Sequence, residues 1–170
     1  KIEQLEKFLT LKLLDSDPLD SETSTSEEGN IELDVKFTGL TSEEKISKIS
    51  QNLSDNQAIY ITDLDEVSYL FNMRNFSQNF SAKIKGRGKC FITKEGVELI
   101  DKLDKIPNKE IFVDKSSINA YDYNLLKSRA KELKENPVKL MKAQKTKAEL
   151  EHLKDAFART DKAVSAIRNY

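Results

Sequence analysis

The pattern of hydrophobic and polar residues switches between two kinds along the middle of the chain. Residues 31–37 alternate between apolar and polar side chains, which predicts a β-strand with one buried face. Residues 41–53 instead repeat apolar side chains at helical spacing behind Thr41 and Glu44, a pair that can form a capping box at a helix start. The same reasoning predicts further strands at residues 58–61, 80–84, 89–93, 97–100, 111–113 and 138–141, a two-turn helix that starts within residues 62–65, and a helix over residues 121–134. Because strands and helices interleave, the sequence predicts an α/β fold, a mixed β-sheet with helices packed on it.

The two ends of the chain carry different patterns. Residues 1–14 place apolar side chains on one face of a predicted amphipathic helix, whereas residues 15–30 are rich in Ser, Thr, Asp and Glu and predict a flexible acidic linker or insertion. A further capping box, Thr146 to Glu149, opens a predicted helix that extends through most of the remaining chain. The apolar stripe of this helix is formed by Leu150, Leu153, Phe157, Val164 and Ile167. The sequence therefore divides into residues 1–14, residues 15–30, an α/β domain at 31–142 and a C-terminal linker helix at 143–170.

Composition narrows the classes of function. The 170 residues include 28 basic and 29 acidic side chains, a net charge of −1, so no overall field draws in nucleic acid or anionic lipid. No apolar run approaches the ~20 residues that a membrane-spanning helix needs. The single cysteine, Cys90, lies in an apolar strand pattern, where it is expected to be a small buried hydrophobe. We therefore predict a cytoplasmic protein with no nucleic-acid or membrane partner.

Few residues suit catalysis or metal binding. The one histidine, His152, lies off the apolar stripe and is expected to be solvated, whereas a hydrolytic metal site needs several converging ligands. Asp63 and Asp65 could share a cation or act as acid and base, but we favour capping of the helix that begins there. The Gly-Arg-Gly sequence at residues 86–88 resembles a phosphate-binding turn and is better explained as a hairpin turn, and the lysines of residues 139–147 indicate a solvated surface or domain contact. We predict no catalytic, metal-binding or cofactor-binding residue in this chain.

Three sequence blocks occur in a specific order. They are Leu40 to Ile46 (LTSEEKI), Ile61 to Arg74 (ITDLDEVSYLFNMR), and a junction that joins Asn136-Pro137-Val138 to Lys142-Ala143-Gln144-Lys145 and Glu149-Leu150. Over roughly residues 35–165, the blocks resemble the non-catalytic domain that precedes the metal-binding domain of Xaa-Pro aminopeptidases, in the creatinase and prolidase family. The departures from the family pattern are Tyr69 in place of Trp, Asn75 in place of Gly, the absence of the usual Asp-Ile-Pro after it, and Phe157 in place of His.

The resemblance implies a ribonuclease-H-like α/β fold and a parent enzyme that cleaves the N-terminal residue preceding proline. In that family two divalent cations, often manganese, are held by two Asp, one His and two Glu, and all five would follow Tyr170 here. This chain alone is therefore expected to be inactive. The resemblance further implies that the domain supports homo-oligomers such as a homodimer, walls the cleft that binds Xaa-Pro peptides, and contacts the catalytic domain. Residues 1–14 would be the tail of a preceding domain, and residues 143–170 the first helix of the catalytic domain.

Two sets of residues are candidates for contacts. Asn72 and Arg74 are the polar positions of the second block; they either face the cleft or partner subunit, or fix the turn after the short helix by bonding backbone carbonyls, which we favour. The exposed interdomain stripe would consist of Leu153, Phe157, Val164 and Ile167. Two other interpretations stay open, a non-enzymatic binding module of the histone-chaperone type and an autonomous oligomerisation scaffold whose last helix docks on its own domain.

Overall fold

The computed structural model describes residues 5–10, 29–76, 83–84, 88–100, 103 and 106–168. Five strands form its main sheet. They are β2 (Gln57–Ile61), β4 (Lys89–Thr93), β5 (Gly96–Ile100), β6 (Glu110–Val113) and β7 (Ala130–Glu132). They lie in the order β5-β4-β2-β6-β7, with β4 antiparallel to both of its neighbours and β2, β6 and β7 mutually parallel. This mixed sheet confirms the predicted α/β fold of the ribonuclease-H-like kind.

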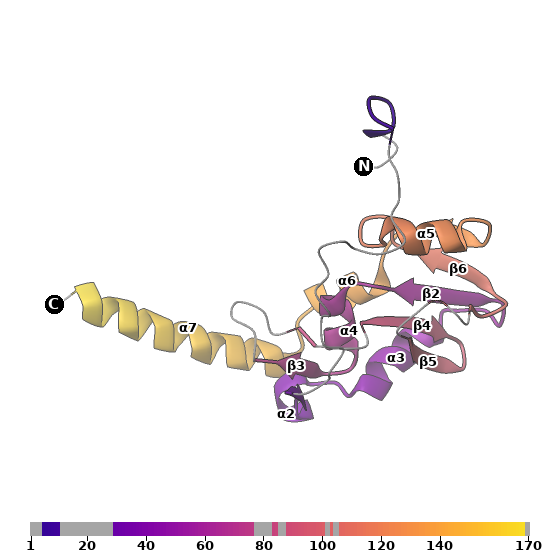
Figure 1. Cartoon of the computed structure of the whole chain (residues 1–170). Coiled ribbons are helices and arrows are strands. Elements are labelled where there is room, and N and C mark those ends of the chain that lie inside the picture. The colour runs from indigo at the N-terminus through magenta and orange to yellow at the C-terminus, as the bar shows by residue number, and fades with distance from the viewer. Residues whose placement is uncertain are drawn as a thin grey trace.

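Helices cover both faces of the sheet (Figure 1). They are α3 (Ser42–Ser50), α4 (Leu64–Leu70), α5 (Ala120–Leu126) and α6 (Pro137–Ala143). Along β2, Ile59 and Ile61 pack in a cluster with α3, α4 and α6, whereas Ala58 and Tyr60 point to the other face, in a cluster that includes Leu126 of α5. Successive strand residues point to opposite faces, so both faces of this central strand are buried.

The local signals at several element boundaries are confirmed. Thr41 and Glu44 form the predicted capping box of α3, with the Glu44 amide donating to the Thr41 hydroxyl at 3.1 Å and the Thr41 amide donating to the Glu44 carboxylate at 2.7 Å. Asp63 caps α4 by accepting from the Asp65 amide at 2.9 Å. The strands at 58–61, 89–93, 97–100 and 111–113 all lie within one residue of their expected bounds.

Three predicted elements are wrong. Residues 31–37 do not form one strand: β1 (Asn30–Glu32) ends early, and the Asp34 side chain caps the short helix α2 (Val35–Thr38). Residues 138–141 are helical in α6, because Asn136 caps this helix and Pro137 occupies its first turn. The helix expected over residues 121–134 ends at Leu126, and residues 130–132 pair with β6 as strand β7.

Two further predictions lie partly outside the described residues. Within 1–14, only residues 5–10 are described, and a turn follows Leu5 there instead of a continuing helix. Phe8 of this stretch is 84% exposed, so its apolar face lacks the packing on which short helices depend. Residues 80–82 and 86–87, of the expected strand and Gly-Arg-Gly turn, lie outside the described part.

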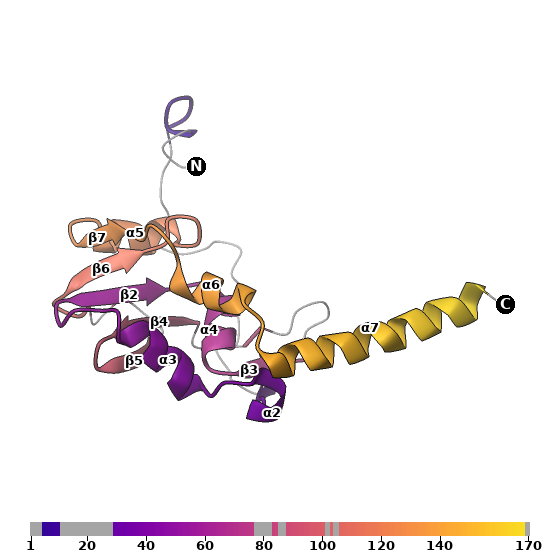
Figure 2. The ribbon, with the colours of Figure 1, turned by 180° about the vertical axis from the view of Figure 1, so that it is seen from behind.

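A small second sheet and a long helix complete the structure. Strand β1 pairs antiparallel with β3 (Met73–Asn75), which brings α2 beside the turn that follows α4. Helix α7 (Lys147–Arg168) then leaves the domain and projects away from it, as both ribbon views show (Figures 1 and 2). None of the described residues of α7 is buried.

Candidate functional site

A buried lysine lies at the junction between the α/β domain and α7. Lys45 of α3 is 1% exposed, and its Nζ donates to the Tyr69 carbonyl at 2.7 Å and to Asn72 Oδ1 at 2.5 Å. The same ammonium lies 3.9 Å from the centroid of the Tyr69 ring, a cation–π contact. The charge is therefore surrounded by acceptors from the end of α4 and from the residues that follow it.

The two polar positions of the second sequence block belong to this junction. Asn72, with a φ of 54°, is buried and donates to the Leu40 carbonyl at 2.9 Å. Arg74 donates to the carbonyls of Ser68 at 2.9 Å and Met73 at 2.7 Å. Arg74 thus bonds backbone carbonyls around the turn after α4, as expected, whereas Asn72 joins this turn to the Leu40 carbonyl just before α3. A contact of either residue with a cleft or partner subunit stays a prediction.

Burial and one nearby carboxylate shift the pKa values of the two cations at this junction in opposite directions. Burial lowers the pKa of Lys45 from 10.5 to about 8, although the Glu149 carboxylate of α7 acts in the opposite direction. Burial likewise lowers the pKa of Arg74, again against the effect of Glu149. A single carboxylate on the first turn of α7 therefore acts on both partly desolvated cations.

Helix α7 starts against the end of α2. The predicted capping box is present, with the Thr146 amide donating to the Glu149 carboxylate at 2.8 Å and the Glu149 amide donating to the Thr146 hydroxyl at 3.1 Å. The Thr146 hydroxyl also donates to the Thr38 carbonyl at 3.0 Å. One turn further on, His152 is exposed on the helix surface, as expected, and one side of its ring lies 4.9 Å from the Phe37 ring.

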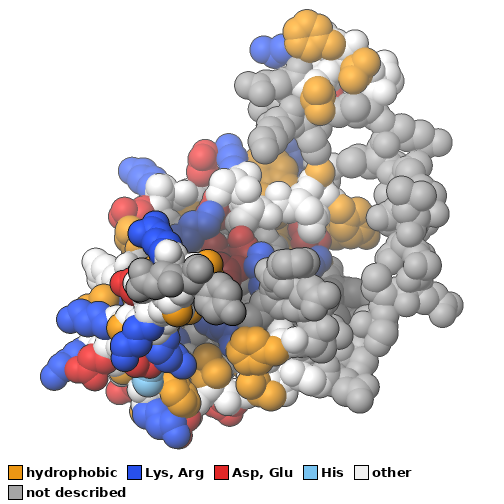
Figure 3. Space-filling model, turned by 90° about the vertical axis from the view of Figure 1, so that its left-hand side faces the viewer, with side chains coloured by type: hydrophobic (Ala, Val, Ile, Leu, Met, Phe, Trp, Pro, Cys, Tyr) orange, Lys and Arg blue, Asp and Glu red, His pale blue; other side chains and the backbone are white. Residues whose placement is uncertain are grey.

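The apolar stripe on the rest of α7 is exposed to solvent. The exposed fractions are 41% for Leu153, 66% for Phe157, 41% for Val164 and 76% for Ile167. Figure 3 views the molecule from the side to which α7 projects and shows hydrophobic side chains interspersed with charged ones. Which molecular surface covers the stripe stays a prediction.

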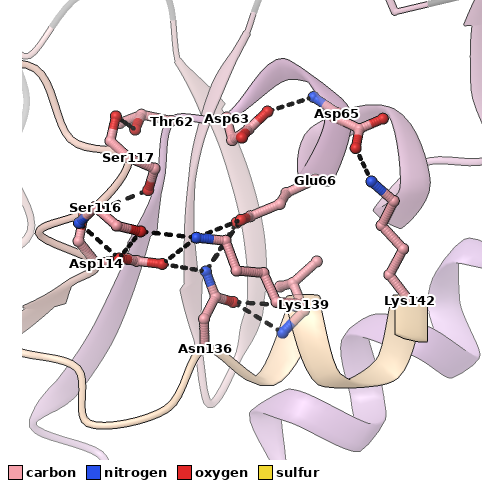
Figure 4. Close-up of polar contacts among 11 residues, drawn as sticks. Thr62, Asp63, Asp65, Glu66, Asp114, Ser116, Ser117, Asn136, Lys139 and Lys142 are labelled. Atoms are coloured by element: carbon pink, nitrogen blue, oxygen red, sulfur yellow. Dashed lines mark hydrogen bonds and ion pairs between the residues drawn. The ribbon is translucent and has the colours of Figure 1, made fainter. Parts of the chain in front are cut away.

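A second polar cluster lies near the carboxyl ends of β2 and β6 (Figure 4). Asn136 Nδ2 donates to both Glu66 carboxylate oxygens, at 3.1 and 3.0 Å, and to Asp114 Oδ2 at 3.1 Å. Lys139 Nζ lies 2.6 Å from Asp114 Oδ2 and 3.7 Å from Glu66 Oε1. The cluster joins α4, the segment after β6 and the first turn of α6 into one hydrogen-bonded unit.

The two carboxylates of this cluster are shifted in opposite directions. Burial raises the pKa of Glu66, only partly offset by the hydrogen bond from Asn136. Burial alone would also raise the pKa of Asp114, but hydrogen bonds from Lys139, Ser116 and Asn136 hold it below its ordinary value. Sequence reasoning missed this cluster; only the Asn-Pro helix start at residue 136 was a local signal of it.

The other residues that were considered for catalysis or metal binding have structural roles. Asp63 caps α4, as expected, and Asp65 forms an ion pair with Lys142. Cys90 is fully buried, and burial raises its thiol pKa to about 12, so the prediction of a small buried hydrophobe is confirmed. Among the described residues no group of three or more His, Cys, Asp or Glu could hold a metal ion.

One comparison with known proteins, against protein-family models, agrees with the family resemblance. Residues 22–83 match the model of the Creatinase/Prolidase N-terminal domain, which supports the resemblance to the N-terminal domain of an Xaa-Pro aminopeptidase-type protein. Among solved structures, the chain is similar to an X-prolyl aminopeptidase from Caenorhabditis elegans, whose description is a cytosolic enzyme with a di-nuclear active site. The identity is 20% and the TM-score 0.38, and the similar part covers 66% of this chain but only 16% of that enzyme's chain. No curated protein matches the sequence.

The helices that the structure describes include none with the length and hydrophobicity needed to span a bilayer.

Proposed function

We propose that this chain is the non-catalytic N-terminal or middle domain of a metal-dependent aminopeptidase that releases the N-terminal residue preceding proline. The observation that carries the proposal is the family match over residues 22–83, which contains the block Ile61 to Arg74. The order and orientation of the five main strands support it, because a ribonuclease-H-like sheet is what the resemblance implies.

The chemistry is assigned to the domain that would follow α7. In this proposal the divalent cations, with manganese as the expected metal, would be held by that domain, as the family resemblance implies. Our proposal gives this chain three supporting roles in a cytoplasmic parent protein: walling the peptide cleft, contributing to a homodimer or larger homo-oligomer, and packing the α7 stripe against the catalytic domain.

An activity assay on two proteins tests the enzyme class. The full-length polypeptide, supplied with Mn²⁺, is expected to hydrolyse an Xaa-Pro tripeptide and to lose activity with a chelator, whereas residues 1–170 alone are expected to show none. Turnover by residues 1–170, or a metal-loaded full-length protein without turnover, would contradict the proposal. A full-length protein that binds histones without hydrolysing peptides would instead support the histone-chaperone type of module.

Thiol labelling tests the role of the stripe. In Phe157→Cys the new thiol is expected to be modified roughly tenfold more slowly in the full-length protein than in residues 1–170, because a docked domain covers it. Asp155→Cys is the matched control, since Asp155 lies on the opposite side of the helix and should be modified at the same rate in both proteins. Native Cys90 is fully buried and should not interfere. Equal rates at Phe157→Cys would exclude the proposed packing.

A further inference from the structure

Helix α7 is attached to the domain at one end only. Its first two turns contact α2, and none of its described residues is buried. The contacts are the Thr146 hydroxyl with the Thr38 carbonyl at 3.0 Å, the ring pair of Phe37 and His152, and His152 Nε2 with the Lys36 carbonyl at 3.4 Å. The direction of a 22-residue helix therefore depends on a few residues at its base.

The Thr146 hydroxyl has two partners at this point. It accepts from the Glu149 amide, which caps α7, and it donates to the Thr38 carbonyl at the end of α2. A hydroxyl can serve as donor and acceptor at once, so one group joins the start of α7 to α2. Removing it would release the helix cap and the attachment to α2 together.

Gly39 allows the close approach of the two helices. It has a φ of 72°, the left-handed conformation of a helix C-cap, and its amide donates to the Val35 carbonyl at 2.7 Å. A Cβ at this position would lie 2.5 Å from Thr146 Oγ1 and 2.8 Å from Thr146 Cβ. Any larger residue would both strain the backbone and displace the base of α7.

Helix α2 is itself fixed to the domain. Strand β1, which precedes it, pairs with β3, and the Leu33 amide donates to the Asn72 carbonyl at 2.7 Å. Asn72 in turn accepts the hydrogen bond from buried Lys45. The contacts at the base of α7 are thus continuous with the hydrogen bonds of the domain interior.

We infer that residues 36–39 form an orientation anchor that fixes the direction of α7 before any other domain covers the helix. The anchor consists of the Lys36 and Thr38 carbonyls, the Phe37 ring and the space above Gly39, and its partners are Thr146 and His152. The inference goes beyond the proposed function and does not depend on it, because it concerns contacts within residues 36–152.

Distance measurements between spin labels test the anchor. Cysteines replace Lys48 on α3 and Lys162 on α7, which are both exposed, and buried Cys90 stays unlabelled. Labelled protein is diluted with unlabelled protein so that only distances within one molecule contribute. The unmodified anchor is expected to give one narrow distance distribution, and Thr146→Val is expected to broaden it about twofold or more, since the helix base is released.

Three further variants make the result specific. Thr146→Ser keeps the hydroxyl and should keep the narrow distribution. Thr160→Val makes the same chemical change further along α7, where the hydroxyl donates only to the Ala156 carbonyl of the same helix, and should also leave it narrow. Gly39→Ala should broaden it through displacement of Thr146 and serves as the second test if Thr146→Val does not fold. A broad distribution with the anchor intact, or folded Thr146→Val and Gly39→Ala proteins with the original width, would overturn the inference.

Discussion

Buried Lys45 should make the stability of this protein rise with pH in an unusual range. Its pKa is lowered from 10.5 to about 8, mainly by burial, so the unfolded chain binds more protons than the folded one between these two pH values. The free energy of unfolding must therefore increase as the pH rises through this window. At about 1.4 kcal/mol per pKa unit, the increase from pH 7 to pH 10 is about 2.5 kcal/mol.

The assay is urea unfolding at a series of pH values, with Lys45→Met as the reference. This variant lacks the titrating amine and leaves the Asn72 and Tyr69 acceptors without their donor, so it is less stable overall, but only the pH dependence is compared. The difference between the two proteins should grow by about 2.5 kcal/mol from pH 7 to pH 10.

Two observations probe the cause of this pH dependence. The Cε resonance of Lys45 in the folded protein should titrate with a midpoint near pH 8. In Glu149→Gln the midpoint should fall further, because the carboxylate that favours the charged amine has been removed. A constant stability difference between pH 7 and pH 10, with an ordinary lysine titration, would refute the reasoning.

Three other substitutions or probes address the domain interior. Asn136→Ala removes a helix cap and the donor shared with Glu66, so urea unfolding should show a loss of about 3 kcal/mol. Cys90 should react with a thiol reagent at least ~100-fold more slowly in the native protein than in urea, because its thiol is fully buried with a raised pKa. Tyr60→Phe removes the 3.0 Å hydrogen bond from the phenol to buried Asp122 and should cost about 2 kcal/mol; ultraviolet titration should show that the Tyr60 phenol ionises only on unfolding, since burial raises its pKa. An unchanged unfolding midpoint, equal thiol rates or an ordinary tyrosine titration would contradict these predictions in turn.

The elements that sequence predicts correctly are those with local signals. Strand β2 is a short apolar run between turn residues, and α3 begins at a capping box that the structure reproduces atom for atom. The misread run at residues 138–141 shows the limit of this reasoning, because four apolar-rich positions fit a strand or a helix equally well. There the Asn136-Pro137 helix start outweighs the apolar pattern.

Other features depend on contacts between distant segments. Residues 130–132 form a strand because β6 offers them a parallel partner, although their apolar spacing also fits a helix. The polar cluster joins Glu66, Asp114 and Asn136, which no local spacing relates. Nor does any sequence pattern indicate that Lys45 is buried, since lysines are almost always exposed.

The length of α7 sets how precisely its base must be held. Twenty-two residues at 1.5 Å per residue extend about 33 Å, so a tilt of about 10° at Thr146 moves the far tip by about 6 Å. Ile167 would then be displaced by more than the ~4 Å that separates touching side chains, whereas Leu153 would shift by only about 1.8 Å. One added methyl group at Gly39, by displacing Thr146, would therefore move the far end of α7 much more than its base. The apolar residues nearest the C-terminal end would be the first to lose contact with a surface that packs on the helix.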